Sequence, residues 1–206
     1  MMPLISRLRR PRFSRHVHRG GEPRSARWAR AASVAALIAL AGALAPVSAR
    51  AQSAGATVVL PGFRGVVRLD TVGTSESVPR APGEVFAAVR AAFDSLGVEQ
   101  AVHDSSTGVV GNLELRLTRK MAGRPMAHWV DCGVGHTGPT ANLYRVHLAI
   151  LVWVTPAASG GTSLKTAVAA GAQALGGPLA DPIACQSTGA IEDVVMNVVR
   201  THRASP

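Results

Sequence analysis

The sequence predicts an α+β fold, in which an antiparallel β-sheet carries two helices packed on one of its faces. The first observation is the stretch Leu143–Thr155, where apolar even-numbered residues alternate with odd-numbered residues that include Arg145 and His147. This period of two is typical of a half-buried strand. The second is that apolar residues recur at helical spacing in two stretches, near 82–97 and near 191–199. The third is that short turns separate the other β-rich runs, which favours hairpins and therefore antiparallel pairing.

Residues 1–51 predict a secretory signal peptide. Ten of the 22 basic residues of the chain lie there, against a single acidic one, and an uncharged apolar run follows at 31–45. Ala49-Arg50-Ala51 predicts cleavage after Ala51, with Val47-Ser48-Ala49 as a competing site that ends at Ala49. The alternative is an uncleaved anchor, which leaves the domain in the same compartment.

Residues 52–206 are therefore expected to form a single exported domain, periplasmic or secreted. With 12 basic and 11 acidic residues, this part has a net charge of 12 − 11 = +1, which disfavours a nucleic-acid partner. The apolar run at 31–45 is shorter than the roughly 20 residues that a membrane-spanning helix needs, and no second run follows. No membrane span is expected once the signal is removed.

The domain is predicted to begin with two short strands. β-rich runs occupy Thr57–Leu60 and Gly65–Val72, and Pro61-Gly62 between them predicts a turn. Residues 75–82 are mostly small or polar and contain two prolines, so they predict a loop.

The first helix is predicted over residues 82–97. Pro82 suits the first helical position, Glu84 lies near the positive end of the helix dipole, and Gly97 can adopt the left-handed conformation that ends a helix. The apolar residues at helical spacing are Val85, Phe86, Val89, Ala92, Phe93 and Leu96.

A hairpin is predicted next, with strands at 98–104 and 109–118 joined by a turn at 104–108. The segment VPRAPGEVFAAVRAAFDSLGVEQAVHDSSTGVVGN, which runs from Val78, resembles the helix-strand-strand opening of helix-grip domains, such as those of the BamC outer-membrane assembly lipoproteins. The resemblance extends as an order of elements to about Val199 and implies a helix-grip-like fold. The prefix contains no cysteine, so it departs from that family in lacking a lipoprotein signal.

The second half is predicted to contain a long loop and a second hairpin. Residues 119–141 show no period and contain four glycines and two prolines, which predicts a loop. The strand 143–155 is followed by a turn at 157–161 and a small-residue strand at 162–172.

The last element is predicted to be a helix that follows a Gly/Pro-rich loop at 174–182. Ser187 or Thr188 is the expected N-cap, and two acidic residues follow in the first turn. The apolar stripe consists of Ile191, Val194, Val195, Val198 and Val199.

The chain contains two cysteines, Cys132 and Cys185. In an exported domain an even pair predicts a disulfide, which here ties the long loop to the start of the last helix. The alternative is two unpaired buried thiols. His128, Cys132 and His136 are separated by three residues each, but two glycines disfavour a helix there and the disulfide competes for Cys132, so no metal site and no cofactor are predicted.

Candidate binding residues lie on the odd-numbered face of the central strand. If both helices cover the even face, Arg145, His147 and Trp153 lie on the other, and Trp129 comes from the neighbouring loop. A mixed apolar and charged face with a tryptophan is typical of a surface for a protein partner or a small ligand. The alternative is that the 119–141 loop covers Trp153 and that Arg145 pairs with a carboxylate.

No catalytic residue is predicted, because the chain contains no G-x-S-x-G, H-E-x-x-H or phosphate-binding glycine motif. The prediction is a non-enzymatic binding or interaction module of the cell envelope or the secreted fraction. The alternative is a small extracytoplasmic hydrolase, which a deep pocket joining His147 or His128 to a carboxylate and a serine would favour.

Overall fold

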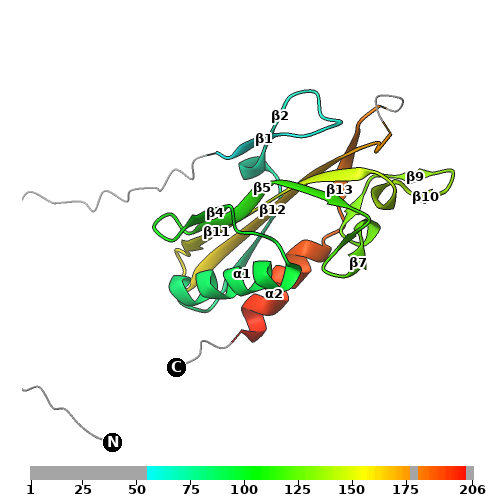
Figure 1. Cartoon of the computed structure of the whole chain (residues 1–206). Coiled ribbons are helices and arrows are strands. Elements are labelled where there is room, and N and C mark those ends of the chain that lie inside the picture. The colour runs from blue at the N-terminus through cyan, green and yellow to red at the C-terminus, as the bar shows by residue number, and fades with distance from the viewer. Residues whose placement is uncertain (1–54, 177–180, 203–206) are drawn as a thin grey trace, which may run out of the picture. The chain divides into compact units, whose positions relative to one another are not determined.

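We describe residues 55–176 and 181–202 from a computed structural model of the chain (Figure 1). The predicted signal peptide and its two cleavage sites lie outside this part. The α+β fold is confirmed, because an antiparallel sheet is combined with two α-helices. The elements are β1 (Thr57–Val59), β2 (Val66–Arg68), η1 (Leu69–Thr71), β3 (Thr74–Val78), α1 (Pro82–Leu96), β4 (Val102–Asp104), β5 (Val109–Thr118), β6 (Lys120–Met121), β7 (Arg124–Pro125), η2 (Met126–His128), β8 (Val130–Asp131), β9 (Val134–Gly135), β10 (Gly138–Pro139), η3 (Thr140–Asn142), β11 (Arg145–Pro156), β12 (Thr162–Gln173), β13 (Ile183–Ser187) and α2 (Ala190–Thr201).

The main sheet is built around the hairpin of β11 and β12. Its strand order is β4-β5-β11-β12-β13-β8, and all neighbours pair antiparallel. β3 shares the outer edge of β12 with β13, since β3 pairs with residues 162–166 and β13 with residues 170–172. The predicted central strand and its return strand are therefore confirmed, and they lie in the middle of the sheet.

Both helices pack on the even-numbered face of β11, as predicted. Figure 1 shows α1 and α2 next to each other on one side of the sheet. α1 begins at Pro82 and ends before Gly97, whose φ of 64° is the expected left-handed conformation. Val146, Leu148 and Ile150 of β11 are fully buried in the core that the two helices close.

The N-cap of α2 differs from the prediction. Gly189 is the N-cap residue, and Ser187 supports it from two positions earlier: the Ser187 hydroxyl accepts a hydrogen bond from the Gly189 N–H (3.1 Å) and donates one to the Glu192 carboxylate (2.9 Å). Ser187 ends strand β13, which the sequence did not predict. Ser187 is thus the last residue of the strand before the helix and supports the N-cap residue, instead of being the N-cap itself.

The predicted disulfide between Cys132 and Cys185 is present, with an S–S distance of 2.01 Å. Both cysteines are buried in the helix-covered core. The bridge therefore ties the 119–141 segment to β13, directly before the last helix.

Two predicted loops contain strands. Residues 74–78 form β3, whose sequence TSESV has a single buried residue, Val78, and therefore shows no apolar alternation. The 119–141 segment contains five two-residue strands and η2, with η3 at its end. These strands are too short for an alternation of apolar and polar residues to be visible in the sequence. Side-chain contacts hold the 119–141 segment in place, for example the hydrogen bond from the Trp129 indole N–H to the Met121 carbonyl (3.0 Å).

The odd-numbered face of the sheet is not open along its length, which corrects the prediction. Residues 56–72, which we call the N-terminal strap, lie across this face and form a second core with it. Leu60 and Leu69 of the strap pack with Leu151 and Trp153 of β11, and Trp153 is only 5% exposed. The covering element is therefore the N-terminal strap and not the 119–141 loop.

Glycines allow the strap to lie directly on the backbone of the sheet. A Cβ atom at Gly171 of β12 would lie 2.0 Å from the Pro61 carbonyl oxygen, and one at Gly62 would lie 2.1 Å from the Ala184 nitrogen. No side chain fits at such distances, so backbone contact determines where this end of the strap docks.

Among the described residues, no helix is both long and apolar enough to cross a bilayer.

Candidate functional site

The four predicted binding residues do not form one site. Arg145 and His147 lie at the start of β11, whereas Trp153 lies six residues beyond His147, or about 20 Å at the rise of a strand. Trp129 belongs to the helix-covered core on the opposite face and is 2% exposed. Trp129 therefore packs inside the 119–141 segment and does not lie beside the other three residues.

His147 lies in a positively charged part of the sheet. Its neighbours across the strands are Arg116 of β5 and Gly171 of β12, and its Nε2 atom is buried without a hydrogen-bond partner. Burial lowers the pKa of His147, and the charges of Arg116 and Arg145 lower it further. These effects favour the neutral imidazole. Arg145 takes part in none of the ion pairs among the described residues.

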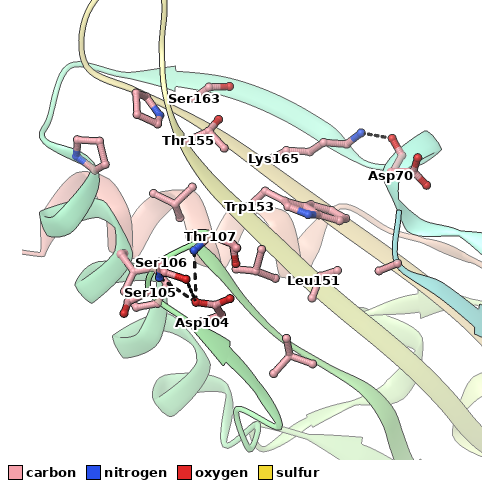
Figure 2. A pocket seen from close by; sticks show the side chains of 18 of the residues that line it. Asp70, Asp104, Ser105, Ser106, Thr107, Leu151, Trp153, Thr155, Ser163 and Lys165 are labelled. Carbon is pink, nitrogen blue, oxygen red and sulfur yellow. Dashed lines mark hydrogen bonds between the residues drawn. The ribbon is translucent and has the colours of Figure 1, made fainter. Parts of the chain in front are cut away.

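A half-open cavity of about 1240 Å³ extends from the odd-numbered face of the sheet, past the β4–β5 turn, to the start of α1, and we call it the Trp153 pocket (Figure 2). The strap, the β4–β5 hairpin, β3, the start of α1 and the adjoining ends of β11 and β12 border it. It is lined by Gly55, Ala56, Asp70, Ser75, Pro82, Gly83, Phe86, Val102, Asp104, Ser105, Ser106, Thr107, Gly108, Val109, Leu113, Leu151, Trp153, Val154, Thr155, Pro156, Ser163 and Lys165. Of the predicted binding residues, Trp153 alone lines it.

A single row of residues across five strands forms the floor of the pocket. Strand register places Asp104 of β4 opposite Val109 of β5, and Val109 opposite Trp153 of β11. Trp153 is opposite Lys165 of β12, and Lys165 is opposite Ser75 of β3. Directly opposed residues project from the same face of a sheet, and all five of these residues line the pocket.

The two sides of this row differ in polarity. Toward the strap, the pocket is lined by Leu151 and Val102, which both pair with Gly111, and by Leu113 further along β5, and all three are apolar. On the other side lie the hydroxyl groups of Thr155 and Ser163. The pocket thus has an apolar inner part and a polar outer part, which is the usual composition of small-molecule sites.

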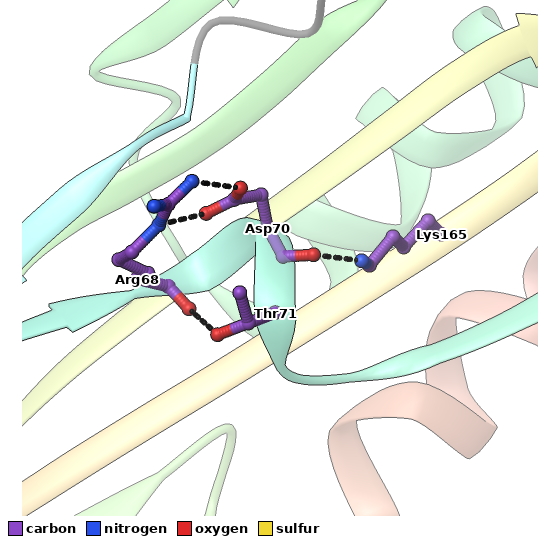
Figure 3. A network of polar contacts seen from close by, with 4 residues as sticks. All are labelled: Arg68, Asp70, Thr71 and Lys165. Atoms are coloured by element: carbon purple, nitrogen blue, oxygen red, sulfur yellow. Dashed lines mark hydrogen bonds and ion pairs between the residues drawn. The ribbon is translucent and has the colours of Figure 1, made fainter.

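Lys165 supplies the positive charge of the pocket. Its ammonium nitrogen lies 5.7 Å from the centroid of the Trp153 ring and donates a hydrogen bond to the backbone carbonyl of Asp70. The Asp70 carboxylate instead accepts two hydrogen bonds from Arg68, at 2.9 and 3.3 Å (Figure 3). The hydrogen bond from Arg68 is the main cause that lowers the pKa of Asp70, and the charge of Lys165 is the smallest.

Asp104 supplies a negative charge at the other end of the row. One of its carboxylate oxygens accepts hydrogen bonds from the Ser106 hydroxyl (2.6 Å), the Ser106 N–H (2.8 Å) and the Thr107 N–H (3.3 Å). These bonds, led by that of the Ser106 side chain, lower the pKa of Asp104 from 3.8 to about 2. The carboxylate therefore closes the β4–β5 turn and is a weak base.

Ser106→Ala should raise the pKa of Asp104 toward its ordinary value of 3.8, because the largest contribution is lost. A folded pKa below the unfolded one means that the ionised carboxylate favours the native state. This contribution is fully present above about pH 3.8 and is lost as the pH falls toward 2. Carbon-13 NMR titration of the carboxyl group measures the shift. Ser105→Ala is the matched control, and an equal change in that variant would contradict the assignment.

No metal site is formed by the residues considered for one. Cys132 is bonded to Cys185, so it is not free to bind a metal. Within residues 55–176 and 181–202, no three His, Cys, Asp or Glu side chains are grouped in a way that could hold an ion.

Sequence reasoning missed Lys165 and Asp104 as site residues, although a signal for both was present. Once the turns at 157–161 and 104–108 are assigned, hairpin pairing places Lys165 opposite Trp153 and Asp104 opposite Val109. No comparable signal marked Asp70, because its place in the pocket depends on where the strap docks.

Comparison with known proteins does not assign this site. No known protein family matches the chain, and no curated protein is significantly similar to it. The resemblance to helix-grip domains therefore stays a prediction.

Proposed function

We propose that this chain is an exported binding domain that holds a small, mainly apolar ligand in the Trp153 pocket. The observation that carries the proposal is a tryptophan at the floor of a cavity whose inner part is formed by leucine and valine side chains. Aromatic residues that line a concave apolar site with a few polar groups at its edge are typical of ligand recognition. Trp153 and Leu151 are almost fully buried beneath the strap, so the ligand would mainly replace water over the half-buried side chains of Val109 and Leu113, which favours binding.

Export is supported by two independent features. The basic prefix, the apolar run and the A-x-A site form the pattern of a secretory signal. The Cys132–Cys185 disulfide suits an oxidising compartment, because disulfides persist there and are rare in the cytosol.

The composition of the pocket supports binding over hydrolysis. Ser105 and Ser106 lie beside Asp104, but no histidine is among the described residues that line the cavity. The Ser106 hydroxyl already donates a hydrogen bond to the Asp104 carboxylate (2.6 Å), and a carboxylate with a pKa of about 2 is a poor general base. His147, the other candidate base, lies at the far end of β11.

The proposal is tested with N-phenyl-1-naphthylamine, a neutral apolar probe that fluoresces when it leaves water. We expect saturable binding at one site per chain by protein expressed from the full-length reading frame. Thr155→Trp should weaken binding at least about tenfold, because the larger side chain fills the outer part of the pocket, and tenfold corresponds to about 1.4 kcal/mol.

The matched control is Thr118→Trp, the same substitution at an exposed threonine on β5 that does not line the pocket. This variant should bind the probe as the unchanged protein does. Equal loss in both variants, or no saturable binding by the unchanged protein, would overturn the proposed function. Circular dichroism verifies that both variants are folded.

A further inference from the structure

We propose that the ligand of the Trp153 pocket is a small amphipathic anion, whose anionic group binds Lys165 and whose apolar body extends across the floor of the pocket toward Val109. This inference rests on the proposed function and adds the chemical class of the ligand. Three features carry it: a cation that forms no ion pair with a described carboxylate, a set of free donors on that cation, and an apolar surface that begins beside it.

Lys165 forms no ion pair with a carboxylate in the described part of the protein. The Asp70 carboxylate is bound through both oxygens by Arg68, whose hydrogen bond lowers the pKa of Asp70 most, whereas the charge of Lys165 lowers it least. Glu76, which follows Ser75 on β3, pairs across the sheet with Leu164 and not with Lys165, and its carboxylate lies 2.8 Å from Arg200. Each acid beside Lys165 on β3 and η1 is thus bound to an arginine.

The acid at the other end of the floor is too distant to neutralise Lys165. Asp104 is three strands away, or about 14 Å at the usual strand spacing, and its carboxylate is occupied by the β4–β5 turn. At that separation the interaction through water is weak and is screened by salt. The pocket therefore has a net attraction for an anion at its Lys165 side.

The ammonium group of Lys165 is positioned to bind an anion. It lies over the Trp153 ring, and one hydrogen bond to the Asp70 carbonyl orients it. An ammonium group has three N–H donors, so two remain for the oxygens of a ligand. A hydrogen bond between charged partners is stronger than a neutral one, particularly where the side chain is half-buried, as it is here.

The apolar body of the ligand has a matching surface. From Lys165 the floor continues across Trp153 to Val109, a distance of about 10 Å at the usual strand spacing. The half-buried side chains of Val109 and Leu113 supply exposed apolar surface there, whereas Trp153 and Leu151 are almost fully buried. A free single-chain carboxylate, with one charged end and an alkyl body, matches both parts, whereas a neutral alkane supplies no anionic partner for Lys165.

The test compares dodecanoate with 1-dodecanol, which have the same chain and differ in charge. Affinities are measured at low ionic strength by displacement of N-phenyl-1-naphthylamine. We expect dodecanoate to bind the unchanged protein about tenfold more tightly, which corresponds to about 1.4 kcal/mol, because its carboxylate can accept a charge-assisted hydrogen bond from Lys165. Added salt should reduce this preference, since the attraction is electrostatic.

Lys165→Met removes the charge and keeps an unbranched side chain on Trp153. This variant should lose the preference for dodecanoate and bind 1-dodecanol as before, and Lys165→Arg should retain the preference. The matched control is Lys120→Met, because Lys120 is the other lysine of the chain, is exposed and lies outside the pocket. That control should bind both probes as the unchanged protein does.

The outcomes separate this inference from the proposed function. Equal binding of both probes by the unchanged protein, or an unchanged preference in Lys165→Met, would overturn the anionic ligand and leave the pocket as an apolar site. Failure of both probes and of N-phenyl-1-naphthylamine to bind would overturn the proposed function itself. The comparison on the unchanged protein needs no variant, so it decides the inference even if Lys165→Met does not fold.

Discussion

Replacing Ile150 by alanine should lower the free energy of unfolding by about 2–5 kcal/mol. Ile150 is fully buried on the face of β11 that packs against both helices, so the substitution removes buried apolar surface and leaves a cavity. β11 is paired on both sides, by β5 and β12, which limits how far the backbone can move to fill that cavity. Denaturant melts followed by circular dichroism measure the loss.

Arg145→Ala is the matched control for this prediction. Arg145 is exposed at the start of the same strand and takes part in none of the ion pairs among the described residues, so its removal should change the stability by less than about 1 kcal/mol. If Arg145→Ala were as damaging as Ile150→Ala, the side chains would not be assigned to the correct faces of β11. A shift of the strand by one residue would exchange the two faces.

Cys185→Ala should also lower the stability, by about 2–5 kcal/mol. The bridge joins residues separated by 53 positions, and in the chain-entropy model a loop of this length contributes about 4 kcal/mol by restricting the unfolded chain. Both cysteines lie in the helix-covered core, so the substitution also removes packing there. Thermal unfolding in the presence and absence of reductant separates the two contributions.

The control for the disulfide is the double variant Cys132→Ala/Cys185→Ala, which leaves no unpaired thiol. Its stability should not depend on reductant, and it should resemble that of the reduced, unchanged protein. Mass spectrometry without reductant should find the peptides of Cys132 and Cys185 linked. Two free thiols per native chain would refute the bridge.

Local pattern was sufficient to predict the central hairpin and both helices. The alternation in β11 assigns one face to the helices, and the glycine after Leu96 ends α1 where predicted. These features are encoded within a few residues, because side-chain period and terminal conformations depend on the local backbone. The disulfide was also predictable, since two cysteines allow a single pairing.

Elements that depend on distant partners were not predictable in this way. β3 is a polar segment that becomes a strand because the edge of β12 is available to it, and β13 forms beside it on the same edge. The 119–141 segment is ordered by contacts such as that between Trp129 and Met121, with no period of its own.

The sequence by itself determined the α+β class, the central strand, the faces of that strand and the cysteine pair. Tertiary structure alone decided that the odd-numbered face is covered in one part and hollow in another, because this depends on where the N-terminal strap docks. That docking is set by backbone contact at glycines far apart in sequence, such as Gly62 and Gly171, and by the packing of Leu60 and Leu69 on β11. Such contacts follow no period along the chain, so the candidate site became visible only once the strap and the sheet were brought together.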